Sequence, residues 1–257
     1  MYNDQVRVPL VIRTPMGGRR GYGPTHSQTL EKLFLGVPGL RVLAPCTLGN
    51  PGELLRAAIL DDEDPVLFVE NKLLYLASLQ DDAHLMDFEL KTEYPTRPAG
   101  SLDGNSPDPQ LAPALSFQDY PPAYTLSVRG APQSDLTLTA YGYMAELARQ
   151  AALRLAYEHE FFVELVVPTQ LAPAGPEPLL ASVRRTGRLL SVEEGSLSFG
   201  WGAEVIARAA EALGLKLRAA GRLAAREMPI PASGPLEAAV LPGVDDIVDR
   251  ALSMSAR

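Results

Sequence analysis

The chain has 257 residues, which is enough for one large or two ordinary domains. Hydrophobic residues make up 46% of it and charged residues 21%, a composition typical of a globular protein that excludes a disordered or fibrous one. The net charge of −8 argues against nucleic acid and anionic membrane as main partners, because the chain has no surplus of Lys and Arg to neutralise phosphate.

The cysteine content and the N-terminal residues bear on the compartment. Cys46 is the single cysteine, so no intrachain disulfide can form, and we expect a buried structural thiol rather than a nucleophile. The first residues show no basic stretch followed by an apolar one, so we expect no signal peptide. No apolar run approaches the about 20 residues that span a bilayer, and we therefore expect a cytoplasmic protein.

The first region, residues 1–76, alternates short apolar runs with helical patterns. Residues 8–12 are apolar at every position, which favours a strand buried on both faces of a parallel sheet. Asn50 followed by Pro51 is a typical helix start, with an Asn cap and Pro at the first helical position. In chain order we predict strand 8–12, helix 27–35 with Ser27 as its cap, strand 40–44, a helix from Pro51, and strand 66–69.

Prolines change the character of the chain over residues 77–133. Seven of them, at 95, 98, 107, 109, 113, 121 and 122, interrupt any periodic pattern, and Asp, Gly and Ser fill the gaps. This composition predicts an extended connector between two domains, with a hairpin near 124–128.

A second α/β unit covers residues 134–257 and is long enough to fold as an independent domain. Strands that alternate with helices indicate parallel strands joined by crossover helices, and hence a doubly wound sheet. We predict strands at 136–140, 161–167, 189–192 and around Leu217, and helices at 143–158, 176–185, 203–213 and 244–253.

Several segments carry a family resemblance in a fixed order. In the first region they are VPLVIRTPMGG at 8–18, GPTHSQ at 23–28, PGLRV at 38–42 and DPVLFVENKLLY at 64–75. In the second they are LTAYG at 138–142, SVRRTGRL at 182–189, VEEG at 192–195 and GWGAE at 200–204. Together they resemble the β subunits of the decarboxylating component of pyruvate and branched-chain 2-oxo acid dehydrogenases.

The resemblance implies a fold and a set of partners. We expect the C-terminal part of a transketolase-type pyrimidine-binding domain, followed by a domain similar to the transketolase C-terminal domain. The expected cofactor is thiamine diphosphate with Mg, shared with an alpha-type subunit that carries the diphosphate-binding domain. The family's upstream part, which carries the glutamate for the aminopyrimidine ring, has no counterpart here, so no cofactor-binding residue can be placed.

This departure predicts a subunit that is inactive alone. We expect a second chain that completes the pyrimidine-binding domain, an acyltransferase bearing a lipoyl or other carrier thiol, and a homo- or hetero-oligomer. Two alternatives stay open, namely a split transketolase that moves a ketol unit and a non-catalytic truncated paralogue that acts in assembly. The residues also leave open which 2-oxo acid or ketose is used.

His26 is the candidate catalytic residue, because the matching histidine of related subunits reaches the active-site channel. An imidazole suits that place since its pKa lies near neutral pH, so it can donate or accept a proton. The alternative is an ordinary loop histidine. Gln28 and Arg13 are candidate channel residues; Gln28 is expected to orient the loop, and Arg13 forms either an ion pair across a subunit interface or a structural one.

Leu10, Ala58 and Asp61 match positions that offer oxygens to a structural potassium ion in some family members. Hard cations bind such oxygen-rich loops. The alternative is a solvated acidic turn, since residues 61–64 read Asp-Asp-Glu-Asp.

Glu193 and Glu194 follow a predicted strand. Neighbouring residues on a strand point to opposite faces, so these two carboxylates are not expected to share a proton. We interpret the pair as a strand-end turn and helix entry that serves subunit contacts. Trp201 is expected to anchor a core or an interface.

Overall fold

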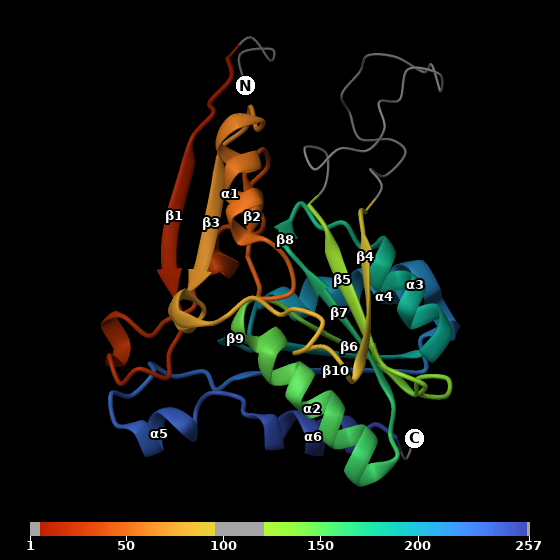
Figure 1. Ribbon diagram of the computed structural model, residues 1–257. Coiled ribbons are helices and arrows are strands. Elements are labelled where there is room, and N and C mark those ends of the chain that lie inside the picture. The colour runs from red at the N-terminus through yellow and green to blue at the C-terminus, as the bar shows by residue number, and fades with distance from the viewer. Residues whose placement is uncertain (1–5, 96–120, 256–257) are drawn as a thin grey trace, which may run out of the picture.

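The computed structural model describes residues 6–95 and 121–255. Their strands form two sheets, a four-stranded sheet in the order β1-β3-β2-β8 and a six-stranded sheet in the order β10-β9-β6-β7-β5-β4 (Figure 1). Within these ranges no helix has both the length and the apolar character that crossing a membrane requires.

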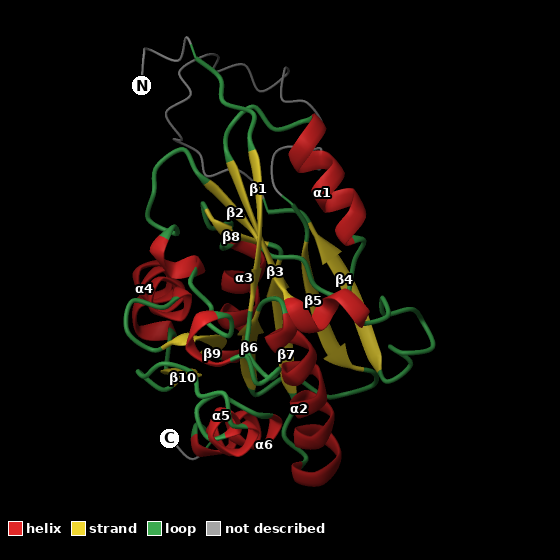
Figure 2. Cartoon of the chain, turned by 90° about the vertical axis from the view of Figure 1, so that its left-hand side faces the viewer, coloured by secondary structure: helices red, strands yellow, loops and turns green. Residues whose placement is uncertain are grey.

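The first sheet consists of β1 (Val11–Met16), β2 (Arg41–Leu43), β3 (Val66–Asn71) and β8 (Gln170–Ala172). β1 and β2 both run parallel to β3, and β8 pairs antiparallel with β2. Helix α1 (Pro51–Leu60) lies alongside these strands (Figure 2). The predicted helix start is confirmed, because the Asn50 side chain accepts hydrogen bonds from the amides of Gly52 and Glu53.

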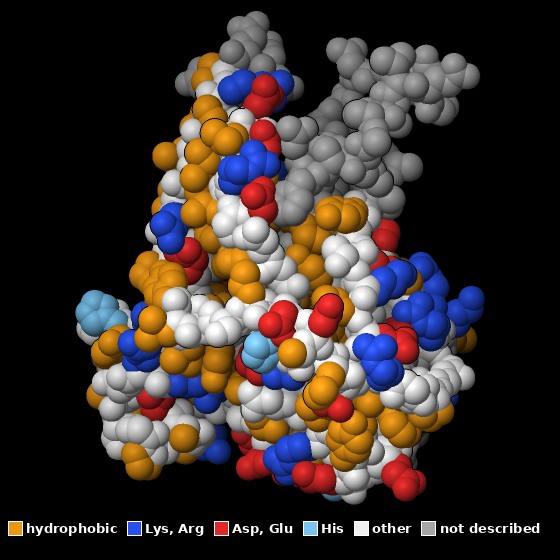
Figure 3. Space-filling model, in the orientation of Figure 1, with side chains coloured by type: hydrophobic (Ala, Val, Ile, Leu, Met, Phe, Trp, Pro, Cys, Tyr) orange, Lys and Arg blue, Asp and Glu red, His pale blue; other side chains and the backbone are white. Residues whose placement is uncertain are grey.

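The prediction of a strand buried on both faces is wrong for β1. The side chains of Val8, Leu10 and Ile12 are about half exposed, at 48%, 50% and 48%. β1 is an edge strand that pairs only with β3, and no element of the described ranges covers its outer side. Hydrophobic side chains gather along this edge in Figure 3. An apolar sheet edge left uncovered is a surface that proteins normally protect.

The predicted helix at 27–35 is also wrong. Within this range the structure has only one short 3-10 turn, η3 (Glu31–Leu33), and a second turn, η2 (Gly23–Thr25), lies before it. Ser27, Thr29 and Glu31 are buried instead of facing solvent. Because these alternate polar residues turn inward toward the second sheet, tertiary contacts override the helical pattern.

The second sheet contains a parallel core of four strands, β6, β7, β9 and β10, with an antiparallel extension of two strands. Its strands are β4 (Phe88–Glu93), β5 (Ala123–Val128), β6 (Leu136–Ala140), β7 (Val163–Pro168), β9 (Arg188–Ser196) and β10 (Ala219–Ala225). Helices α2 (Tyr143–His159) and α6 (Val244–Ser253) share one core cluster, whereas α3 (Glu177–Thr186) and α4 (Trp201–Leu213) share another. Helices therefore cover both faces, and the predicted doubly wound α/β architecture is confirmed.

Strands β4 and β5 lie inside the segment 77–133 that was expected to be a connector. β5 bridges β4 and β7, so both strands belong to the second sheet (Figure 1). The prolines suggested an irregular segment, but Pro95, Pro121 and Pro122 lie just outside the strands and not within them. Residues 96–120 lie outside the described residues, and the domain boundaries at 76 and 134 remain predictions.

The two sheets share one hydrophobic cluster. It contains Met16, Val42 and Val69 of the first sheet and Tyr141 and Trp201 of the second region. The Trp201 ring meets Tyr141 edge-on at 5.1 Å, which agrees with the expected core anchor. The first sheet is thus packed firmly on the second, although its outer edge is open.

Candidate functional site

The candidate site is the loop of residues 17–30, which follows β1. Met16, the last residue of β1, lies opposite Asn71, the last residue of β3. After Asn71 the chain continues as η4 (Lys72–Leu76). The loop and η4 therefore lie together at the carboxyl ends of parallel strands, the edge at which open α/β sheets bind their ligands.

Glycine is required at the start of this loop. Gly17 has a φ of +94°, and a Cβ there would lie 2.3 Å from Asn71 Nδ2. A Cβ on Gly18 would lie 2.6 Å from Leu241 Cδ1 of the second domain. The two glycines thus let the loop pass closely between the end of β3 and the C-terminal domain.

Two carboxylates of the second domain hold the loop by its backbone. The Gly18 amide donates to Glu194 Oε1 at 2.5 Å. The amides of Arg19 and Gly21 donate to the two oxygens of Glu237, at 2.7 and 3.1 Å. Glu237 belongs to α5 (Gly234–Ala238), a short helix absent from the sequence prediction. Bonds from amides to a carboxylate are among the stronger hydrogen bonds, so they fix the loop.

Asn71 connects the same carboxylate to the end of β3. Its Nδ2 donates to Glu194 Oε2 at 3.1 Å, and its Oδ1 accepts from the Leu73 amide at 3.0 Å. Burial raises the pKa of Glu194, and the hydrogen bond from the Gly18 amide opposes that rise. Glu194 therefore joins the loop, the first sheet and β9 in one network.

His26 lies on the exposed part of the loop. Its amide donates to the Gly23 carbonyl at 3.3 Å, and its own carbonyl accepts a hydrogen bond from Lys72 Nζ. Within residues 6–95 and 121–255 no side chain or backbone group bonds the imidazole. The backbone of His26 is thus anchored while its ring faces solvent.

Gln28 and Arg13 have different surroundings. The Gln28 carbonyl accepts from the Gly17 amide at 3.3 Å and closes the base of the loop. The Arg13 guanidinium forms a two-bond ion pair with Glu70, at 2.8 and 3.1 Å. The Tyr75 hydroxyl donates to the same carboxylate at 3.2 Å. Of the two interpretations of Arg13, this geometry favours the structural ion pair.

The three residues of the expected potassium site are brought together only in part. Ala58 and Asp61 line one small cavity, but Leu10 does not. The Leu10 carbonyl already accepts the Val66 amide at 2.8 Å. In the part of the chain that the structure describes, no three His, Cys, Asp or Glu residues are grouped to hold a metal ion. The potassium site remains a prediction.

A buried acidic cluster lies behind the loop and consists of Glu31, Glu193 and Glu194. The Tyr141 hydroxyl donates to Glu31 Oε1 at 2.5 Å, and the Gly202 amide donates to Glu193 Oε1 at 2.9 Å. The second oxygens of Glu31 and Glu193 have no partner among the described residues. Burial raises the pKa of Glu31, and it raises that of Glu193 to about 7.

The cluster corrects the interpretation of Glu193 and Glu194. The pair was expected to form a strand-end turn and helix entry that serves subunit contacts, but β9 continues to Ser196 and both side chains are buried. The expectation that they point to opposite sides agrees with their bonds, since Glu194 meets the loop and Glu193 meets α4. The amide that bonds Glu194 is 176 positions away in the sequence, so no local pattern indicates that partner.

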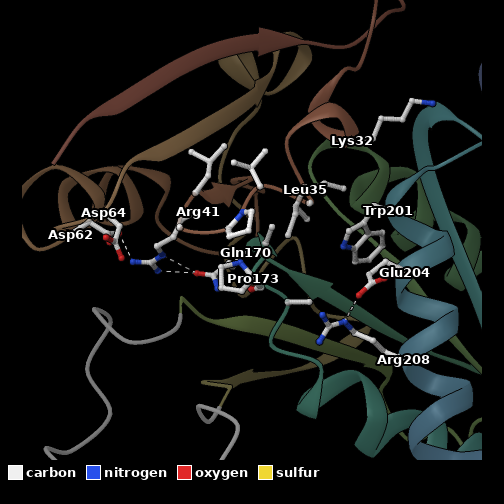
Figure 4. A pocket seen from close by; sticks show the side chains of 18 of the residues that line it. Lys32, Leu35, Arg41, Asp62, Asp64, Gln170, Pro173, Trp201, Glu204 and Arg208 are labelled. Carbon is white, nitrogen blue, oxygen red and sulfur yellow. Dashed lines mark hydrogen bonds and ion pairs between the residues drawn. The ribbon is translucent and has the colours of Figure 1, made fainter. Parts of the chain in front are cut away.

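The largest cavity lies elsewhere, between the segment before β2 and the start of α4 (Figure 4). It measures about 850 Å³ and does not include His26 in its lining. Arg41 in its wall bonds Asp62 and Gln170, and Arg208 bonds Glu204 at 2.6 Å. Because these charged groups satisfy one another, the loop with its free imidazole is the better candidate for chemistry.

The described residues do not fit the metal-diphosphate end of thiamine diphosphate. Glu194 and Glu237, the carboxylates nearest the loop, are both engaged with backbone amides. Neither is therefore available to bind a metal ion or an aminopyrimidine nitrogen. These two carboxylates are therefore not candidates to hold the cofactor.

Two domain families match the chain. Residues 1–77 match the pyrimidine-binding domain of transketolase, and residues 127–247 match the transketolase C-terminal domain. A solved structure described as a split gene transketolase, in an inactive β4 tetramer, covers 97% of this chain and 67% of its own with a TM-score of 0.61. At 18% identity this similarity shows the fold alone.

Similar proteins lead to the same family as the domain matches. The chain is 34% identical over 249 residues to the β-2 subunit of the pyruvate dehydrogenase E1 component from Oryza sativa, covering 96% of this chain and 58% of that protein. It is 29% identical to the β subunit of a 3-methyl-2-oxobutanoate dehydrogenase from Mycobacterium tuberculosis, covering 95% and 60%. It is also 29% identical to the β subunit of an acetoin oxidoreductase from Bacillus subtilis, covering 99% and 64%. The chain thus spans about 60% of the length of these relatives.

Proposed function

We propose that the chain forms one wall of a composite cofactor cleft. The premise is that it belongs to the transketolase-like β subunits of thiamine-diphosphate-dependent 2-oxo acid dehydrogenases. The observation that carries this proposal is the loop at the carboxyl ends of β1 and β3. Two carboxylates of the C-terminal domain fix its backbone, and His26 remains open to solvent. This is the geometry of a channel wall rather than of a complete active site.

His26 is the residue to which we assign a direct role. Its backbone is tied to Gly23 and Lys72, so the ring is presented from a fixed position. From there the imidazole would hydrogen-bond an oxygen of the substrate or of the acyl group, and it would donate or accept a proton near neutral pH. Gln28 supports the base of the loop through its backbone carbonyl.

Companion chains would supply what the described residues lack. We assign thiamine diphosphate and its Mg to an alpha-type subunit, because no carboxylate at the loop is free to hold a metal. A second chain would add to the open edge of β1 and cover Val8, Leu10 and Ile12, completing the pyrimidine-binding domain. An acyltransferase with a lipoyl or carrier thiol would accept the acyl unit.

Co-expression with an alpha-type subunit and a completing β-type chain tests the proposal. The purified assembly should decarboxylate a 2-oxo acid only when thiamine diphosphate is present, and His26→Ala should lower kcat at least about 100-fold, the usual contribution of a general acid or base. His84→Ala is the matched control, because His84 is an exposed histidine that bonds only Asp81, and it should leave the rate unchanged.

Other outcomes select the alternatives. Turnover of a ketose donor in place of a 2-oxo acid would identify a split transketolase. An assembly that binds thiamine diphosphate equally well with and without this chain, and gains no activity from it, would support a role in assembly alone. Turnover by the isolated chain would contradict the composite cleft.

A further inference from the structure

Two cations, one in the His26 loop and one in η4, lie close to the same aromatic ring. Arg20 Cζ is 6.0 Å from the centroid of the Tyr22 ring, and Lys72 Nζ is 5.6 Å from it. Tyr22 is 49% exposed, so both cations lie at the surface rather than in the core. Arg20 comes from the loop and Lys72 from η4, two segments that meet at the carboxyl ends of β1 and β3.

Neither cation has an acidic partner in the described ranges. No carboxylate lies within ion-pair distance of Arg20 or Lys72, although the whole chain carries a net charge of −8. The nearby carboxylates Glu194 and Glu237 are occupied by backbone amides of the loop. Among the described residues, Arg20 and Lys72 therefore form no close ion pair, and their charged groups stay available to a ligand.

The two cations are close enough to affect each other. Burial is the main cause that lowers the pKa of Lys72, and the positive charge of Arg20 lowers it further. Glu194, Tyr22 and Glu237 oppose this shift. Lys72 Nζ donates one hydrogen to the His26 carbonyl and has others to donate. An oxyanion bound between the two cations would offset the repulsion between them.

We propose that Arg20, Tyr22 and Lys72 form an anion-binding subsite beside His26, which takes one carboxylate or phosphate group of a bound ligand. The Arg20 guanidinium offers a planar fork of donors that matches either oxyanion, and the Lys72 ammonium adds a point charge. Because Lys72 also donates to the backbone carbonyl of His26, the subsite adjoins the same loop that carries His26.

The anion has two sources under the proposed function, on which this assignment of the ligand rests. It is the carboxylate of the 2-oxo acid or the phosphate of a carrier arm that brings the acceptor thiol. Both present the same chemistry to Arg20 and Lys72, so competition experiments distinguish them.

Binding of inorganic phosphate and of acetate to the purified full-length chain tests the subsite by calorimetric titration. Arg20→Gln should weaken the binding of both probes about tenfold, which corresponds to about 1.4 kcal/mol, because it removes a charge-assisted hydrogen bond. Arg56→Gln is the matched control, because Arg56 is an exposed arginine already paired with Glu53 on α1, and it should leave the affinity unchanged. Equal affinities of wild type and Arg20→Gln, or no measurable binding of either probe to wild type, would overturn the proposal.

Displacement of the phosphate probe then separates the two sources. Displacement by a 2-oxo acid assigns the subsite to the substrate carboxylate, and displacement by phosphopantetheine assigns it to a carrier arm. In the active assembly Arg20→Gln should raise the KM for that ligand and change kcat little, whereas His26→Ala lowers kcat and leaves phosphate binding intact. Failure of the subsite and failure of the proposed activity therefore give different results.

Discussion

The carboxyl group of Glu193 is fully buried where β9 meets α4, and Glu193→Gln tests the effect of that burial on stability. Its Oε1 accepts the Gly202 amide at 2.9 Å, and its Oε2 has no partner in the described part of the chain. A glutamine of the same shape keeps an oxygen for the Gly202 amide and cannot ionise. The substitution therefore changes the charge of the group and little else.

The size of the effect on stability follows from the pKa of Glu193. Burial raises the pKa of Glu193 from its ordinary value of 4.5 to about 7, with the Gly202 amide opposing and Glu31 adding to the rise. The folded state then holds a proton between pH 4.5 and 7 that the unfolded state releases, so the free energy of unfolding falls as pH rises through this window. At about 1.4 kcal/mol for each pKa unit, the whole loss is about 3 kcal/mol.

Urea denaturation followed by circular dichroism, at pH values from 4.5 to 8 and one protein concentration, measures this loss. The wild-type and Glu193→Gln chains should have similar free energies of unfolding at pH 4.5. The variant should be more stable by about 3 kcal/mol at pH 8. Glu211→Gln, on the exposed side of α4, should follow the wild type at every pH. A stability difference between Glu193→Gln and wild type that does not change with pH would refute the reasoning.

Two further predictions concern the loop and the thiol. Gly17→Ala places a Cβ 2.3 Å from Asn71 Nδ2 at a φ of +94°, so it should reduce the free energy of unfolding, measured in urea, by about 1–3 kcal/mol. Gly36→Ala is the control and should be close to neutral, because nothing lies within 4 Å of the added Cβ. Equal effects of the two substitutions would contradict the loop geometry. Burial raises the pKa of the Cys46 thiol to about 11. Iodoacetamide at pH 8 should therefore label this thiol only after unfolding. Rapid labelling of the folded chain would show that the thiol is accessible and would contradict the prediction.

Local patterns predicted much of the fold. Strand 136–140 and helix 244–253 agree with β6 and α6 to the residue, because each has an apolar pattern of one clear period bounded by turn residues. The helix from Pro51 was also predicted, because the Asn50 cap acts within three residues. Such signals depend only on neighbours in the sequence.

The errors arise where distant contacts decide. The apolar run at 8–12 resembles a buried strand, but only the sheet order shows that β1 lies at an edge. The pattern at 27–35 is compatible with a helix, but Glu31 turns inward to meet Tyr141, 110 positions away. Neither fact can be read from a window of local sequence.

The candidate site shows the same division. His26 was identified through a family resemblance, not through a local pattern, and its role remains a prediction. The carboxylates that hold its loop were missed, because Gly18 and Glu194 are 176 positions apart and Arg19 and Glu237 are 218 apart. The sequence alone does not distinguish a buried glutamate from an exposed one, because it does not show which backbone amides bond the carboxylate.

The proposed active site has two separate requirements, a cover for the apolar sheet edge and a fixed conformation of the His26 loop. The first sheet has an open edge at β1, yet the loop beyond β1 is held from the opposite side by β9 and α5 of the same chain. Under the proposed function, companion chains would cover the apolar surface and bind the cofactor, whereas the hydrogen bonds that hold the backbone of His26 lie within this polypeptide. The loop can therefore keep its conformation whatever covers the open edge of β1, because carboxylates of the C-terminal domain bond its backbone amides.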